Sequence, residues 1–180
     1  MLKLAINTLR NLVRQTQGSE IAEAAAVLPV MFTVMLGIFW FGQAFSIYGT
    51  ITRAAQEGAR AGAAPICSTC SGGNTAATNA YNALQASMTI AKLDSANAQP
   101  SPASLLNSCT GGSPPACSSV SSHVCIQTGV LLSSTGSGST PVCGISVTFQ
   151  YPFQFWLPFT SLNKQKIWMT AAAQARMETQ

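Results

Sequence analysis

Few side chains in this chain could carry chemistry: six cysteines, one histidine and five acids among 180 residues. Cys67 and Cys70 have the Cys-x-x-Cys spacing of thiol redox motifs, although no strand-turn-helix pattern surrounds them. His123 is the only histidine and Asp94 the only aspartate, so a Ser-His-Asp triad or a multi-histidine metal site lacks its parts. These counts argue against a hydrolase.

The cysteines more simply predict disulfides, because all of them follow a long apolar segment and would share one oxidising compartment beyond a membrane. Six cysteines allow about fifteen pairings, which the sequence leaves open. Cys109 with Cys117, or Cys117 with Cys125, could form a local bridge, whereas Cys125 with Cys143 would need a wide hairpin with displaced register. A membrane-anchored redox or metal-binding protein that uses Cys67 and Cys70 is the alternative. The predicted disulfide residues are Cys67, Cys70, Cys109, Cys117, Cys125 and Cys143.

The apolar segment predicts a membrane-spanning helix. No charged residue occurs from Ala24 to Thr52, and an apolar run of about 25 residues is long enough to cross a bilayer. Pro29 predicts a local kink or unwinding near the start of the span. A signal peptide that ends near Ala61 and Ala63 would be the simpler alternative, but the run is too long and the site too distant.

Charge sets the expected topology. Charged residues make up only 8% of the chain, which indicates membrane or polymer contact and not an ordinary soluble surface. Lys3, Arg10 and Arg14 precede the span without an acid beside them, so the N-terminus is predicted to be cytoplasmic and the C-terminal domain periplasmic or extracellular. The net charge of +4 is therefore topological, and no nucleic-acid partner is expected.

A glycine and a glutamate five positions apart stand directly before the span, in the sequence Gly18-Ser19-Glu20-Ile21-Ala22-Glu23. This sequence resembles the processing site of type IV pilin-like proteins. The resemblance implies that a prepilin peptidase cuts after Gly18, and that Glu23 pairs with the new amine of Ser19, on its own chain or a neighbour, to set helix register. Alternatively, Glu20 and Glu23 merely complement the positive end of a helix dipole.

Further segments to compare are Leu28-Pro29, Arg53 to Arg60 and, more loosely, Val147 to Phe153, Leu157-Pro158 and Thr170 to Met177. Together with Gly18 to Glu23 they resemble the TadE-like minor pilin or pseudopilin family of tight-adherence (Tad/Flp) type IV pili. The resemblance implies a structural, non-enzymatic protein without a cofactor, in the bacterial inner membrane. Its implied partners are membrane lipid, other pilin or pseudopilin subunits, the pilus assembly platform and the prepilin peptidase. A pseudopilin of the type II secretion kind is the related alternative, and residues 67–122 carry none of the resemblance.

The predicted fold is α+β: a long N-terminal transmembrane helix that continues into a pilin-like head with a second helix and a small antiparallel sheet. The expected domains are a cleaved basic leader (1–18), the span with its extension (19–64) and an exported disulfide-bearing head (65–180). After the span, small residues recur at helical spacing and predict close packing of another backbone. These helix-packing residues are Ala54, Ala55, Gly58, Ala61 and Gly62.

Within the head, the apolar spacing predicts a second helix over 74–93 and a loop without regular elements over 94–122. Residues 124–132 and 142–151 alternate like strands and should pair as a hairpin with one buried face, and 167–177 should form a last strand. An aromatic cluster between the last two strands could be core, a membrane-interface contact or a subunit contact. It comprises Tyr151, Phe153, Phe155, Trp156 and Phe159.

Overall fold

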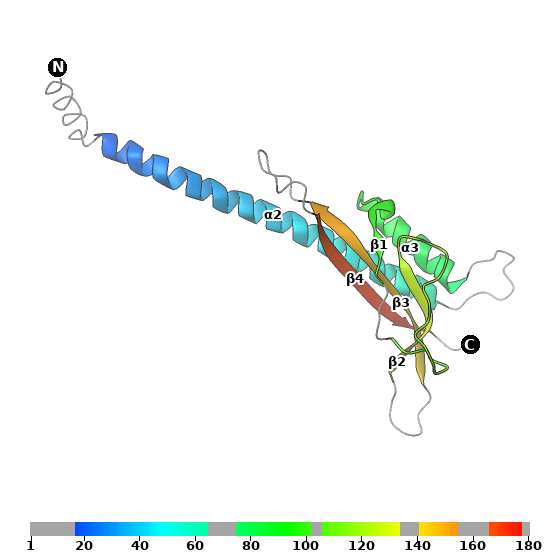
Figure 1. Ribbon diagram of the computed structural model, residues 1–180. Coiled ribbons are helices and arrows are strands. Elements are labelled where there is room, and N and C mark those ends of the chain that lie inside the picture. The colour runs from blue at the N-terminus through cyan, green and yellow to red at the C-terminus, as the bar shows by residue number, and fades with distance from the viewer. Residues whose placement is uncertain (1–16, 65–74, 102–105, 134–140, 155–165, 178–180) are drawn as a thin grey trace, which may run out of the picture. The chain divides into compact units, whose positions relative to one another are not determined.

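The computed structural model describes residues 17–64, 75–101, 106–133, 141–154 and 166–177. The chain divides into two compact units, residues 1–43 and 44–180, and each is considered by itself. Helix α2 (Gln17–Ala63) is assigned as one helix throughout, so the unwinding expected at Pro29 does not occur (Figure 1). Next to Pro29, the Thr33 hydroxyl donates to the Pro29 carbonyl at 2.8 Å.

Helix α3 (Ala76–Ile90) confirms the predicted second helix. Thr75 caps its N-terminus, since the Thr75 hydroxyl accepts a hydrogen bond from the Thr78 amide at 3.2 Å. One face of α3 is buried and the opposite face is exposed, as the amphipathic spacing predicts. The buried residues are Ala76, Ala77, Ala80, Leu84 and Met88.

The sheet is built around one central strand, β3 (Val142–Gln154). Strand β4 (Lys166–Arg176) pairs with one side of β3, and β2 (Cys125–Ser133) followed by the short β1 (Gln99–Pro100) pairs with the other. All pairings are antiparallel. The predicted hairpin and last strand are therefore confirmed, and so is the α+β class.

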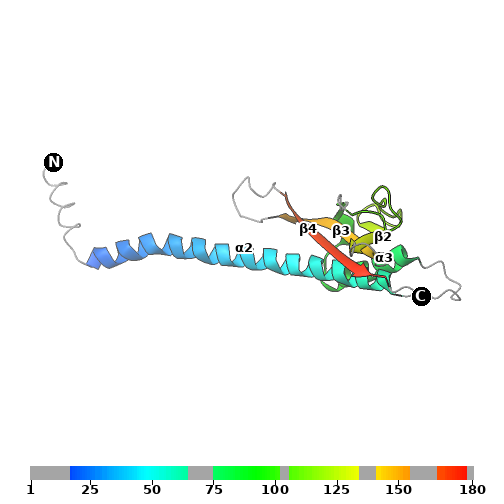
Figure 2. The ribbon, with the colours of Figure 1, turned by 90° about the horizontal axis from the view of Figure 1, so that it is seen from below.

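The core of the second unit lies between the sheet and the two helices (Figure 2). Alternate residues of β3, from Ile145 to Tyr151, face this core together with Ile126 of β2. The C-terminal part of α2 contributes Ile51 and small residues, and α3 contributes Leu84 and its alanines. Because α2 presents so little side chain there, the backbones of the two helices can approach closely.

The opposite face of β3 was expected to face solvent, and this prediction is wrong for its middle. Ser146 and Thr148 are buried, as is Gln127 beside them on β2. The segment that follows β1 folds against β2: the Gln127 amide donates to the Pro115 carbonyl at 2.7 Å, and the Ser118 amide donates to the Ile126 carbonyl at 2.8 Å. A polar strand face is thus covered by a loop, which alternation along one strand cannot reveal.

The region predicted as loop, 94–122, contains two short regular elements within its described part. The 3-10 turn η1 (Ser95–Asn97) forms because the Asp94 carboxylate accepts a hydrogen bond from the Ala96 amide at 2.9 Å. Strand β1 then pairs with Gln150 and Phe149 of β3. The prediction failed there because pairing with an existing strand stabilises two residues that have no strand preference of their own.

Filling the space at Gly62 should destabilise the head. A Cβ atom at Gly62 would lie 2.9 Å from the Ala76 carbonyl oxygen and 2.9 Å from the Ala80 Cβ. We expect Gly62→Ala to lower the free energy of unfolding by about 1–3 kcal/mol, as overpacking of a core does. The measurement is thermal unfolding of the detergent-solubilised protein followed by circular dichroism. Gly49→Ala is the matched control, because a Cβ there meets nothing within 4 Å. Equal melting temperatures for the two variants would contradict the close helix contact.

Candidate assembly site on the N-terminal helix

The N-terminal part of α2 carries an exposed apolar surface. Ile21 is 74% exposed and Phe45 is 71% exposed, and most large apolar side chains between them are at least half exposed. The apolar stretch is not buried by the rest of the protein, which distinguishes it from the core helix of a soluble domain. A helix with so much apolar surface needs lipid or other helices around it. It fits a single-pass membrane anchor.

The predicted processing and register residues lie at the start of this helix. Gly18 and Ser19 belong to the first turn of α2. Glu23 is exposed, one turn after Ser19, and the next charged residue along the chain is Arg53. Residues four apart share a helix face, so Ser19 and Glu23 lie above one another. Glu23 is thus the last carboxylate before the charge-free apolar surface.

The predicted helix-packing residues lie farther along α2. Ala54, Ala55, Gly58 and Gly62 are buried, whereas Ala61 is only partly buried. A Cβ at Gly58 would lie 3.0 Å from the Ala80 carbonyl oxygen, so the backbone that packs here is that of α3 in the same chain.

Sequence reasoning missed two members of this face, Ile51 and Ala59, which are fully buried. Their spacing of eight residues, with Ala55 midway between them, continues the same helical stripe and could have identified them.

An open groove of about 560 Å³ runs between α2 and α3. Thr50, Arg53 and Glu57 line it from α2, and Ser87 and Ile90 line it from α3. Its walls combine one basic and one acidic group with small apolar side chains.

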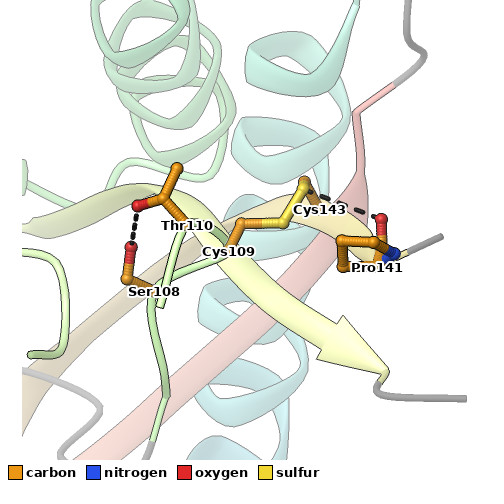
Figure 3. Close-up of a disulfide and its surroundings, with 5 residues drawn as sticks. All are labelled: Ser108, Cys109, Thr110, Pro141 and Cys143. Carbon is orange, nitrogen blue, oxygen red and sulfur yellow. Dashed lines mark hydrogen bonds between the residues drawn. A yellow bond between two sulfur atoms is a disulfide. The ribbon is translucent and has the colours of Figure 1, made fainter. Parts of the chain in front are cut away.

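Two disulfides connect described cysteines. Cys117 and Cys125 join the loop to the start of β2 across eight positions, one of the two local pairings considered from the sequence. Cys109 does not pair with Cys117 but with Cys143, 34 positions away at the start of β3 (Figure 3).

The Cys109 amide also donates to the Gly129 carbonyl at 2.8 Å, at a bulge where Gly129 has φ of 70°. The bulge and this hydrogen bond hold Cys109 against the strands. Sequence spacing alone gives no signal for the long-range pair.

The remaining predicted residues of interest lie outside the described part of the chain. They are Cys67, Cys70, Phe155, Trp156 and Phe159. The described residues contain no group of three or more His, Cys, Asp or Glu side chains that could hold a metal ion.

Over the described residues, these features define an α+β protein with one long apolar helix, which fits a membrane anchor, and a disulfide-bonded head. Residues 18–60 match the family model described as TadE-like protein, which confirms the resemblance over the N-terminal helix. The match covers 43 of the 180 residues, all of them within α2, and does not reach α3 or the sheet. No curated protein and no solved structure matches the chain.

Removal of the disulfide that closes the longer loop should destabilise the protein more than removal of the other. A bridge that closes a longer loop removes more entropy from the unfolded chain, and the expected contributions are roughly 3–4 kcal/mol for Cys109–Cys143 and about 2–3 kcal/mol for Cys117–Cys125. The double replacement Cys109→Ser with Cys143→Ser should therefore lower the melting temperature more than Cys117→Ser with Cys125→Ser. Peptide mapping under non-reducing conditions provides the check on connectivity. A Cys109–Cys117 peptide in that map would refute the assignment.

Proposed function

We propose that this protein is a minor pilin or pseudopilin that takes part in the assembly of a Tad pilus. It enters the inner membrane with residues 1–18 in the cytoplasm and the head on the periplasmic side. A prepilin peptidase then removes the leader after Gly18, and the mature subunit joins or primes the pilus through α2. The role is structural, and the partners are other subunits and the assembly platform.

One observation carries this proposal: the Gly18 to Glu23 sequence directly adjoins an exposed apolar helix, inside the segment that matches the TadE-like family. An ordinary membrane anchor needs the apolar helix but has no use for a glycine and a glutamate at this spacing. A subunit that is cut and then packed beside identical helices needs both features.

Glu23 gives the proposed assembly its register. A lone carboxylate in apolar surroundings costs roughly 2.5–3.5 kcal/mol even on the lenient insertion scale, so it requires a cationic partner. Cleavage after Gly18 creates such a partner in the amine of Ser19, which shares the helix face of Glu23. Between neighbouring subunits, the same pair forms only when the helices are aligned along their axes.

In this proposal the two parts of α2 have different roles. The small residues from Ala54 to Gly62 are occupied by α3, so they support the head of their own chain. The exposed apolar surface from Ile21 to Phe45 remains available for lipid before assembly and for neighbouring subunits afterwards. The disulfide-bonded loop on the sheet would then face outward, where it can cap the assembly or recruit a partner.

The N-terminus of the protein tests the pathway most directly. We expect membrane-extracted protein to begin at Ser19 in cells with the prepilin peptidase and at Met1 in cells without it, as measured by N-terminal sequencing and intact mass. Gly18→Val should retain the leader, because a branched side chain prevents close approach to the backbone at the cut. Gly37→Ala, where a Cβ meets nothing within 4 Å, should be processed normally. A Met1 start in peptidase-containing cells would reject the pilin-like pathway.

Replacement of Glu23 should separate processing from assembly. We expect Glu23→Ala protein to start at Ser19 and to enter the sheared pilus fraction roughly tenfold less than the original, equivalent to about 1.4 kcal/mol of contact free energy. Quantitative immunoblotting of membrane and pilus fractions gives the ratio. Glu20→Ala is the matched control, since it removes an acid from the same helix turn and should incorporate normally. Equal losses for both variants would mean that the acids act only on the helix dipole.

A further inference from the structure

The polar face of β3 is interrupted by apolar residues near the end of the β3–β4 hairpin. We define the hairpin end as Tyr151–Gln154 of β3 together with Lys166–Met169 of β4, which pair residue by residue. In the middle of β3, apolar residues alternate with Ser146, Thr148 and Gln150. At the hairpin end the next member of that polar series is Pro152, and its partner on β4 is Trp168.

Both faces of the hairpin end expose apolar side chains. Ile167 pairs with Phe153 and Trp168 pairs with Pro152, so Ile167 and Trp168 point to opposite faces of the sheet. Ile167 is 48% exposed and Trp168 is 39% exposed. Among the described residues outside α2, only Ile90 and Val120 are further exposed large apolar side chains, and both lie elsewhere. A strand end that exposes large apolar side chains on both faces and ends in the polar pair Gln154 and Lys166 is suited to an interfacial environment.

Measured along the axis of α2, the hairpin end lies close to the level of Ala44, where the second unit begins. Figures 1 and 2 show β3 running antiparallel to this part of α2, and Ile145 contacts the site of Gly62 near the end of the helix. From Ile145 to Phe153 the strand rises about 26 Å at ~3.3 Å per residue. From Gly62 back to Ala44 the helix rises about 27 Å at ~1.5 Å per residue. In agreement, Ile47 and Met169 both pack against the same core cluster.

That level lies near the expected border of the bilayer. The charge-free stretch from Ala24 to Thr52 measures about 43 Å as a helix, close to the ~40–45 Å of a bilayer with its headgroup regions. Because about 30 Å of this length lies in the hydrocarbon core, each headgroup region takes about 6 Å. The residues from Tyr48 to Thr52 would therefore occupy the headgroup region at this end of the stretch, and Ala44 would lie about 6 Å below its inner border. Tyr48, which is half exposed, lies there as aromatic side chains at membrane interfaces do.

We infer that the hairpin end is a second membrane contact, which inserts Ile167 and Trp168 into the lipid headgroup boundary beside α2. The inference depends on the membrane span in the proposed function, but not on cleavage or pilus assembly. Lipid is the occupant because the surface continues the level of the span and carries a tryptophan. The exposed Lys166 lies nearer the bilayer interior than Trp168, and its long stem can carry the amine back toward the lipid phosphates, as lysine stems do at membrane borders.

Depth-dependent fluorescence quenching tests this contact. The chain has three tryptophans, Trp40, Trp156 and Trp168, so Trp40→Phe with Trp156→Phe leaves Trp168 as the only reporter. The full-length variant is placed in nanodiscs of phosphatidylcholine and phosphatidylglycerol that contain lipids brominated near the headgroup or near the acyl end. We expect blue-shifted emission, several-fold stronger quenching by the shallow brominated lipid than by the deep one, and weak quenching by aqueous acrylamide.

Two matched reporters make each outcome decisive. The variant that retains only Trp40 reports on the span and should be quenched by lipid bromine. Val120→Trp, in a chain with all three tryptophans replaced by Phe, reports on an exposed apolar position in the loop and should be quenched by acrylamide alone. If Trp40 responds to lipid while Trp168 behaves like the Val120→Trp reporter, the hairpin contact is wrong and the span stands. If Trp168 is shielded from both quenchers, a protein contact covers it and the lipid contact is likewise wrong. If Trp40 itself ignores lipid bromine, the span fails, and the inference fails with it.

Discussion

The close approach of α3 to α2 is the contact on which the head depends. It is possible only because α2 carries no side chain at Gly58 and Gly62 and very small ones at Ala54 and Ala55. With the two helix backbones this close, Leu84 and Met88 of α3 and the core face of β3 complete one continuous core. A larger residue in the stripe would move α3 outward and open the core along its length.

The same constraint separates the two uses of the first helix. The part of α2 with small residues packs against the rest of its own chain. The part with Phe, Leu, Ile and Met side chains is exposed. The proposed function needs both kinds of surface on one helix, because there the helix holds the head and also packs among neighbouring subunits. Glu23 and the glycine before Ser19 lie at the far start of the exposed surface, where cleavage and register belong in the proposed function.

The sheet is stabilised differently on its two faces. Helices cover one face through apolar contact, while the loop on the other face is held by two disulfides and by hydrogen bonds to β2. Three atoms beneath or beside this loop have no hydrogen-bond partner among the described residues: Gln127 Oε1, Ser146 Oγ and Thr148 Oγ1. Burial of such an atom costs about 1–3 kcal/mol of folding free energy. The two disulfides offset this cost on the loop-covered face, where apolar packing is weaker. In an oxidising compartment, covalent bonds of this kind persist.

The sequence alone determined the features that depend on local pattern. The charge-free run from Ala24 to Thr52 predicts a helix that is apolar all round, the spacing in α3 predicts an amphipathic helix, and the alternation in β3 and β4 predicts paired strands. The Gly18 to Glu23 sequence likewise led to the family that residues 18–60 match.

Only the tertiary structure decided which partner each surface meets. It assigned the small stripe of α2 to α3 in the same chain, paired Cys109 with Cys143 across 34 positions, and covered the polar residues Ser146 and Thr148 with a loop. These outcomes depend on contacts between segments that lie far apart in the chain. The periodicity of a helix or strand shows which residues share a face, but it does not show which other segment packs against that face.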